Sequence, residues 1–236
     1  MSEVQDHSVV VTRALLGMTV VTGLIDAVSF LSLGHVFTAN MTGNVVLLGF
    51  AVAGVPEVSI ARSLSALLAF LVGAAIGGRI LARSISGSAL GRARAIFAIE
   101  GVCLAAATVA AIGYRAGSPE TRQVYAIIAL TSVAMGMRNA SVRKLAIPDL
   151  TTTVLTLTIT GLAADSSLAG GSNPRWQRRI AAVLALFAGA ALGAIFVERS
   201  VFLALLVTAL VTCLCSVALL LAFRATPPAM APASRS

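Results

Sequence analysis

The stretch GLIDAVSFLSLGHVFTANMTGN, from Gly23 to Asn44, decides the fold because it occurs twice in the chain. It returns in weakened form as GMRNASVRKLAIPDLTTTVLTLT, from Gly136 to Thr158. A second stretch, AFLVGAAIGGRILARS at 69–84, returns as ALFAGAALGAIFVERS at 185–200, with seven of sixteen positions identical. The sequence therefore predicts an internal duplication. Duplicated membrane transporters commonly place inverted repeats around a central binding site.

The composition is that of an integral membrane protein. Hydrophobic residues make up 58% of the 236 residues, charged residues make up 11%, and the mean hydropathy is +0.97. Soluble domains carry about 25% charged residues. The first residues, MSEVQDHS, are acidic and polar. We therefore expect no cleavable signal peptide and a retained first span.

The net charge of +8 comes from residues placed as membrane orientation requires. Sixteen of the seventeen basic residues are Arg, and most stand at the ends of apolar segments. A face that binds nucleic acid would instead gather its basic residues on one soluble surface. The sequence predicts membrane lipid around this chain and no nucleic-acid partner.

Six apolar segments are long enough to cross a membrane, which takes about 20 residues for about 30 Å of hydrocarbon. They cover 9–33, 61–83, 93–114, 122–142, 178–197 and 200–223. Two further runs, 41–55 and 151–164, have only 15 and 14 residues. Such lengths suit a re-entrant or half helix better than a span.

The distribution of basic residues favours re-entry of the two short runs. If all eight segments cross, the basic residues divide 8 to 9 between the two sides. If the short runs enter and return, the division is 13 to 4, as the positive-inside rule expects. Each half then has three spans, an odd number, so the halves are inverted. Eight ordinary helices, two of them short, are the alternative.

The predicted fold class is an all-α integral membrane protein with two inverted repeats of three spanning helices, each with one short re-entrant or half helix. We divide the chain into a cytoplasmic N-terminus (1–8), a first membrane repeat (9–114), an outer linker (115–121), a second repeat (122–224) and a disordered cytoplasmic tail (225–236). Both termini are expected in the cytoplasm.

Small residues recur at equivalent positions of the two halves. Gly73 and Gly77 correspond to Gly189 and Gly193, and two alanines stand within each pair. Small residues at this spacing let helix backbones approach closely. The pattern predicts helix packing, and it also suits a face on which the repeats move or which holds a second copy in a homo-oligomer.

The densest polar cluster at a membrane boundary is FTANMTGN, at 37–44. A helix that begins there presents free N–H groups and a partial positive charge. Such an end can hold a small anionic or zwitterionic metabolite. The predicted substrate contacts, with those of the second copy, are Thr38, Asn40, Thr42, Asn44, Thr152 and Thr156. The alternative is that these residues only cap two short helices.

Ionisable residues within spans are costly and point to function. Asp26 is the predicted proton-coupling residue, and its repeat partner, Asn139, has the same shape without the charge. Glu100 is a second candidate for proton coupling. Arg138 and Asn139 are further candidates for substrate contact. The alternatives are structural roles, such as ion pairs of Asp26 with Arg138 or of Glu100 with Arg79.

No motif of an enzyme is present. The chain has no HExxH, no GxxxxGK[ST] and no GxSxG, and it contains only two His, His7 and His35. We predict no catalytic residue, no metal and no cofactor.

The run GLIDAVSFLSLGHVFTANMTGNVVLLG, at 23–49, resembles the YoaK-like family of bacterial inner-membrane proteins, a domain of unknown function. The likeness is specific at Gly23, Asp26 and 37–44, and it continues at Gly136 and Asn139 in the second half. It covers nearly the whole chain. The resemblance implies a multi-pass protein of the bacterial inner membrane, and it implies no substrate.

The leading hypothesis is a secondary transporter with a small-molecule site at the interface of the repeats, coupled to protons through Asp26. The alternatives are a membrane scaffold that does not transport, and a channel. A polar cavity where the short helices meet would favour transport. A dry interface with an exposed small-residue face would favour a scaffold, and a continuous wet path would favour a channel.

Overall fold

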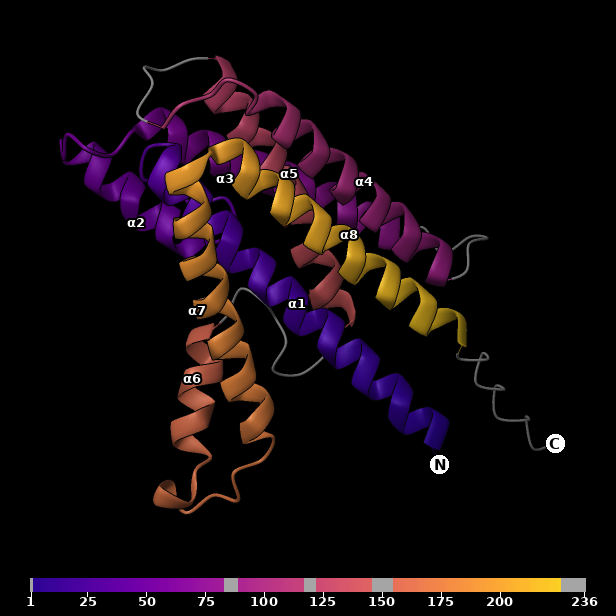
Figure 1. The fold of residues 1–236 in the computed structure, drawn as a ribbon. Coiled ribbons are helices and arrows are strands. Elements are labelled where there is room, and N and C mark those ends of the chain that lie inside the picture. Colours follow the sequence, from indigo (N-terminus) through magenta and orange to yellow (C-terminus); the bar gives the residue numbers. More distant parts are fainter. Residues whose placement is uncertain (1, 83–88, 117–121, 146–154, 226–236) are drawn as a thin grey trace.

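The computed structural model describes residues 2–82, 89–116, 122–145 and 155–225, and these residues form helices without strands (Figure 1). The helices are α1 (Ser2–Ser32), α2 (Met41–Val52), α3 (Ile60–Ala82), α4 (Ala89–Ala110), α5 (Arg122–Leu145), α6 (Leu155–Ala164), α7 (Trp176–Arg199) and α8 (Val201–Ala225), with a 3-10 turn, η1 (Ser167–Ala169), after α6.

The helices correspond to the apolar segments of the sequence. The six long segments became α1, α3, α4, α5, α7 and α8, and the two short runs became α2 and α6. The all-helical fold class is confirmed. The first residues of the second short run, 151–154, lie outside the described residues, as do most of the predicted linker and tail.

Fewer helices than predicted have the composition of a free-standing span. In the described residues, four are long and apolar enough to cross a membrane: Val10–Ser32, Ile60–Ala82, Trp176–Arg199 and Val201–Ala222. Four polar residues, Arg138, Asn139, Arg143 and Lys144, interrupt or follow the apolar part of α5.

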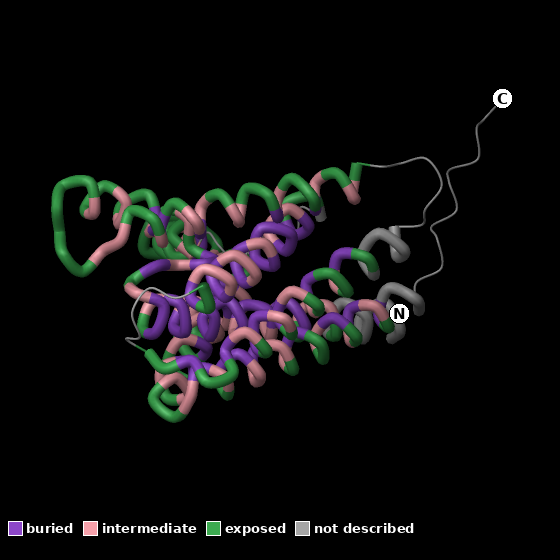
Figure 2. The backbone as a smooth tube through the Cα atoms, turned by 90° about the horizontal axis from the view of Figure 1, so that it is seen from above, coloured by how far each residue is buried: buried purple, intermediate pink, exposed green. Residues whose placement is uncertain are grey.

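Two helices form the centre of the bundle. In α1, 67% of the apolar window is buried, against 17% in α3 and α7. In α5, the side chains of Val124, Ile127, Met135 and Arg138 are buried. Figure 2 shows the buried backbone gathered in the interior and the exposed backbone at the periphery. Because α5 is enclosed by protein, it can carry polar groups that a lipid-facing helix could not.

The glycine pairs bring helices of the two halves together. A Cβ atom on Gly189 of α7 would collide with the carbonyl oxygen of Val20 in α1. A Cβ atom on Gly73 of α3 would collide in the same way with the carbonyl oxygen of Val133 in α5. Gly77 and Gly193 lie one turn further along the same two contacts. The small-residue faces are therefore filled within the chain, and a homo-oligomer would need a different surface.

The partner helices α1 and α5 also carry a glycine at each of these two crossings. A Cβ atom on Gly23 would collide with the carbonyl oxygen of Leu186, and one on Gly136 with that of Phe70. Each crossing thus has a glycine on both helices, and the two crossings use equivalent positions of the duplicated sequence.

The central helices α1 and α5 run in opposite directions. Val28, near the end of α1, packs in one cluster with Val124 and Ile127, near the start of α5. Earlier in α1, the carbonyl oxygen of Met18 accepts a hydrogen bond from Arg138, near the end of α5. The order of contacts along one helix is therefore the reverse of the order along the other.

The segment between α1 and α3 begins at the C-terminal end of α1, and its last residues lie beside that same end. The N–H of Ala39, just before α2, donates to Asp26 in the interior of α1. After α2, the carbonyl oxygen of Glu57 lies 3.2 Å from Nδ1 of His35, beyond the end of α1. The 12 residues of α2 measure about 18 Å at about 1.5 Å per residue. The chain after α1 therefore turns back to the level of Asp26, and α2 leads from there to the end of α1.

Adding one methyl group at the crossing of α3 and α5 tests this packing. We expect Gly73→Ala to lower the free energy of unfolding by about 1–3 kcal/mol, because the added group overpacks a closed contact. Gly78→Ala, on the same helix, is the matched control, because a Cβ atom there meets nothing within 4 Å. Denaturant unfolding in detergent measures both variants. Equal stability of the two would contradict the packing.

Candidate functional site

A cavity of about 500 Å³ lies where α1, α2, α6 and α7 meet. Its size is in the range of small-molecule sites, about 300–1,000 Å³. Its polar side chains are those of Thr22, Asp26, Asn40, Thr42 and Thr156, and the other lining residues are apolar or glycine. The site combines an apolar wall with a few convergent polar groups, as ligand sites do.

Asp26 both lines the cavity and holds the start of α2 in place. One of its carboxylate oxygens accepts a hydrogen bond of 3.1 Å from the N–H of Ala39. The N–H of Asn40 also points at this carboxylate. When Asp26 is ionised, its negative charge faces the positive end of α2, which is a favourable arrangement.

Asn40 and Thr42 reach the cavity from the first turn of α2. Asn40 is the N-cap, and its side-chain oxygen accepts a hydrogen bond of 3.2 Å from the N–H of Gly43. Both side chains are exposed. They can offer oxygen atoms to a ligand without losing a buried contact.

The other two polar residues of this segment have different positions. Asn44 is buried and makes two hydrogen bonds with the backbone of Phe37. Its side-chain oxygen accepts a bond of 2.8 Å from the N–H of Phe37, and its side-chain nitrogen donates to the carbonyl oxygen of Phe37. The ring of Phe37 stacks on that of Phe30. Thr38 is fully buried, and its hydroxyl has no hydrogen-bond partner among the described residues. Neither Asn44 nor Thr38 lines the cavity, although the sequence placed both at a substrate.

The second half contributes the first turn of α6. Thr156 is exposed and lines the cavity beside Leu155, as the sequence predicted for Thr156. Asn139, the counterpart of Asp26, donates to the carbonyl oxygen of Met135 at 2.8 Å and does not line the cavity. Thr152 lies outside the described residues. The cavity is therefore built mainly from the first half.

Arg138 and Glu100 form a buried ion pair away from the cavity. Nε of Arg138 lies 2.6 Å from Oε1 of Glu100, and a second guanidinium nitrogen bonds the same oxygen. The guanidinium also donates to the carbonyl oxygen of Met18 and to the hydroxyl of Thr212. Side chains or backbone of α1, α4, α5 and α8 thus meet at one point. The sequence analysis predicted a substrate contact for Arg138 and proton coupling for Glu100. In the structure, the two side chains bond each other.

Thr22 belongs to the cavity but was not singled out from the sequence. It stands four residues before Asp26 in α1, so both lie on one face of the helix. Its hydroxyl donates to the carbonyl oxygen of Met18 at 3.1 Å. The four-residue spacing from Asp26 was the signal that could have identified it.

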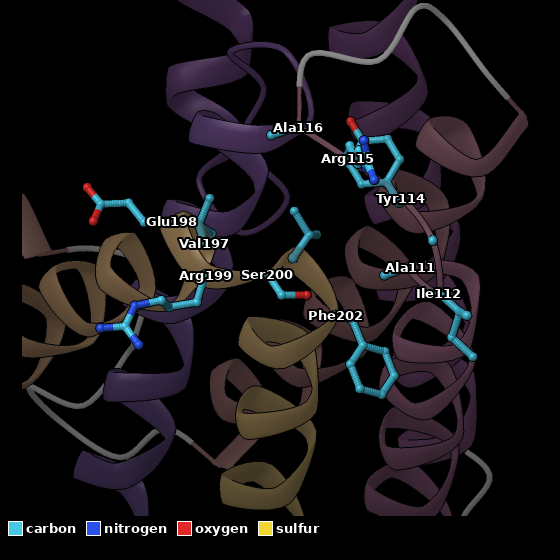
Figure 3. A pocket seen from close by; sticks show the side chains of 12 residues that line it. Ala111, Ile112, Tyr114, Arg115, Ala116, Val197, Glu198, Arg199, Ser200 and Phe202 are labelled. Atoms are coloured by element: carbon cyan, nitrogen blue, oxygen red, sulfur yellow. The ribbon is translucent and has the colours of Figure 1, made fainter.

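A second pocket, of about 680 Å³, lies between the end of α4 and the turn from α7 to α8 (Figure 3). In Figure 3, Glu198 and Arg199 lie on one side, well apart from Tyr114 and Phe202. The hydroxyl of Tyr114 is already used, since it donates to the carbonyl oxygen of Ser32 at 2.6 Å. The polar groups do not converge on a ligand position. Within the described residues, no group of three or more His, Cys, Asp or Glu could hold a metal ion.

Two comparisons with known proteins gave matches. Residues 14–219 match a family described as "Protein of unknown function (DUF1275)". The UPF0700 transmembrane protein YoaK of Bacillus subtilis (strain 168) is 38% identical over 148 residues, which is 61% of this chain and 62% of that protein. The chain thus spans about three fifths of the length of this curated relative. No solved structure matches the chain significantly.

A double-mutant cycle tests the ion pair. Glu100→Gln and Arg138→Met should each lower the free energy of unfolding by about 3–5 kcal/mol, because each leaves one buried charge without its partner. The double variant should lose clearly less than the sum of the two losses. Denaturant unfolding in detergent gives all three values. Additive losses would show that the two side chains do not interact.

Proposed function

The chain belongs to the DUF1275 family of YoaK-like membrane proteins, and from that premise we propose that it is a secondary transporter of a small polar metabolite. The cavity of about 500 Å³ at the starts of the two short helices carries this proposal. A polar cavity at this place is what transport requires, since substrate sites of duplicated transporters lie near the midplane beside interrupted helices.

The internal arrangement supports two inverted repeats. The equivalent helices α1 and α5 run in opposite directions, as the contact orders of Val28 and Met18 indicate. The crossings of α7 on α1 and of α3 on α5 use equivalent glycines. In this proposal, one half rocks against the other around the cavity, and the two glycine crossings are the surfaces along which the halves move.

Asp26 is the coupling residue in this mechanism. It is the only ionisable side chain among the described residues of the cavity wall. Its carboxyl group can bind a proton while the cavity faces one side and release it on the other. The substrate lies against Asn40, Thr42 and Thr156. Arg138 and Glu100 take no part in binding, and they hold four helices together.

The membrane orientation follows from the same arrangement. We propose a plasma-membrane protein with both termini in the cytoplasm and with α2 and α6 entering from opposite faces. The return of residue 57 to the end of α1 supports this for α2. A scaffold would need an exposed small-residue face, and the glycine pairs are buried instead.

Labelling of single cysteines tests the orientation. In a chain whose three native cysteines are replaced by alanine, Glu57→Cys should react with an impermeant maleimide added to intact cells. Leu168→Cys should react only after permeabilisation, although Leu168 is 99% exposed in the structure. Protection of residue 57 in intact cells would show that α2 crosses the membrane.

Ligand-induced thermal stabilisation tests the site. Purified protein is screened with small carboxylates, amino acids, amines, sulfate and nucleobases at acidic and alkaline pH. A true ligand at about 100 times its Kd should stabilise by about 2.7 kcal/mol. Asn40→Ala and Thr156→Ala should lose this effect. Thr160→Ala is the matched control, because Thr160 is exposed on α6 and does not line the cavity. No stabilisation by any compound would favour the scaffold.

A further inference from the structure

The formal side-chain charge among the described residues of the cavity wall is that of one carboxyl group. Among the described residues that line the cavity, Asp26 carries the only formal charge. Among the described residues, the wall therefore offers a carboxylate, hydroxyl groups and an amide, but no side-chain cation.

Among the described residues of α1, α2, α6, α7 and α8, no charged group neutralises Asp26. The sequences of α2 and α6 contain no charged residue, and neither does α8 between Val201 and Ala222. The charged residues of α7 stand in its first and last turns, where Arg179 pairs with Asp165 at 2.7 Å. On α1, the next described ionisable residue is Arg13, more than three turns away.

Among the described residues, the buried cation that bonds α1 is already neutralised. Arg138 reaches α1 at Met18, eight residues before Asp26, and it is paired with Glu100. The positive end of α2 faces the Asp26 carboxylate itself, through the N–H of Ala39. An anion that entered while Asp26 is ionised would therefore stand beside a carboxylate without a cationic partner, and like charges at short range repel each other.

The same cavity suits a cation that carries hydrogen-bond donors. The hydroxyl oxygens of Thr22, Thr42 and Thr156 and the amide oxygen of Asn40 can all accept hydrogen bonds. Ammonium and guanidinium groups are donors without acceptors. Oxygen acceptors around a single carboxylate complement both their charge and their hydrogen-bonding groups.

We propose that the cavity binds a small solute with an ammonium or guanidinium group, and that this cation and a proton are alternative occupants of Asp26. This inference rests on the proposed transport function and names its substrate class. The cation binds as the carboxyl O–H bond breaks, and the proton leaves to the water on the side to which the cavity is open. One carboxylate cannot hold both, so the protein exchanges one proton for one positive charge.

The asymmetry of the duplication sets this stoichiometry. The counterpart of Asp26 is Asn139, whose side chain is bonded to the carbonyl oxygen of Met135. The second half therefore has no equivalent carboxylate. A single exchange site per chain follows, and the exchange carries no net charge.

Proton release from proteoliposomes tests the exchange. Vesicles with purified protein and a pH-sensitive dye inside are made acidic within, and guanidinium or methylguanidinium is added outside. These cations cannot cross as neutral bases. We expect the internal pH to rise with the protein present. We also expect their binding, measured by thermal stabilisation, to strengthen by up to tenfold per pH unit over the range in which the free carboxyl group is protonated.

Two variants separate the role of Asp26 from a general effect of lost charge. Asp26→Asn still offers an oxygen to the N–H of Ala39, and its side chain has the shape of Asn139, the counterpart in the second half. This variant should abolish both proton release and the pH dependence of binding. Asp165→Asn is the matched control, since its carboxylate pairs with Arg179 outside the cavity. Asp165→Asn should retain both proton release and the pH dependence of binding. If Asp26→Asn does not fold, the pH dependence of the unaltered chain decides.

The outcomes distinguish this inference from the function on which it rests. Proton release that persists in Asp26→Asn, or cation binding that does not vary with pH, would overturn the exchange. Binding of lactate or sulfate that Asn40→Ala abolishes, with no binding of any of the cations, would overturn the substrate class and leave the transport function standing. No binding of any cation or anion would overturn both.

Discussion

At Gly73 and Gly189, two pairs of helices approach so closely that a single methyl group would occupy the place of a carbonyl oxygen on the neighbour. These backbone contacts join each half of the chain to the other half, because α7 lies on α1 and α3 lies on α5. Within a membrane, helix association depends on close packing, since the surrounding lipid is as apolar as the side chains. The central position of α1 and α5 follows from these two crossings.

Enclosing α1 and α5 makes room for polar groups that lipid would not tolerate. Two polar centres result, and they have different surroundings. Arg138 and Glu100 are almost completely buried, and the guanidinium of Arg138 bonds Oε1 of Glu100, the backbone of α1 and the side chain of Thr212 in α8. The second carboxylate oxygen of Glu100 has no hydrogen-bond partner among the described residues. Removal of either partner leaves a charge that the interior cannot solvate. This centre joins four helices.

The centre at Asp26 is open on one side. Its carboxylate orders the start of α2, while the same side chain lines a cavity with hydroxyl and amide groups around it. A group that both orders the start of a short helix and lines a cavity can couple its protonation to conformation, because protonation weakens its hydrogen bonds with the N–H groups of Ala39 and Asn40. The segment from 33 to 59 is the part of the structure that such a change would reach first.

The sequence by itself determined the helices and the duplication. Apolar runs and their interruptions gave the limits of α3 and α7 to within a few residues, because helix length in a membrane depends on local hydrophobicity. It also singled out Asp26, Asn40, Thr42 and Thr156, because polar residues in apolar runs are conspicuous, and these four line one cavity in the structure. Only the tertiary structure decided that Arg138 pairs with Glu100, 38 residues away. It also decided that the side chain of Asn44 bonds the backbone of Phe37 and does not line the cavity. The reason is geometric: periodicity places a side chain on a helix face, and only the crossing of helices distant in the chain decides what that face meets.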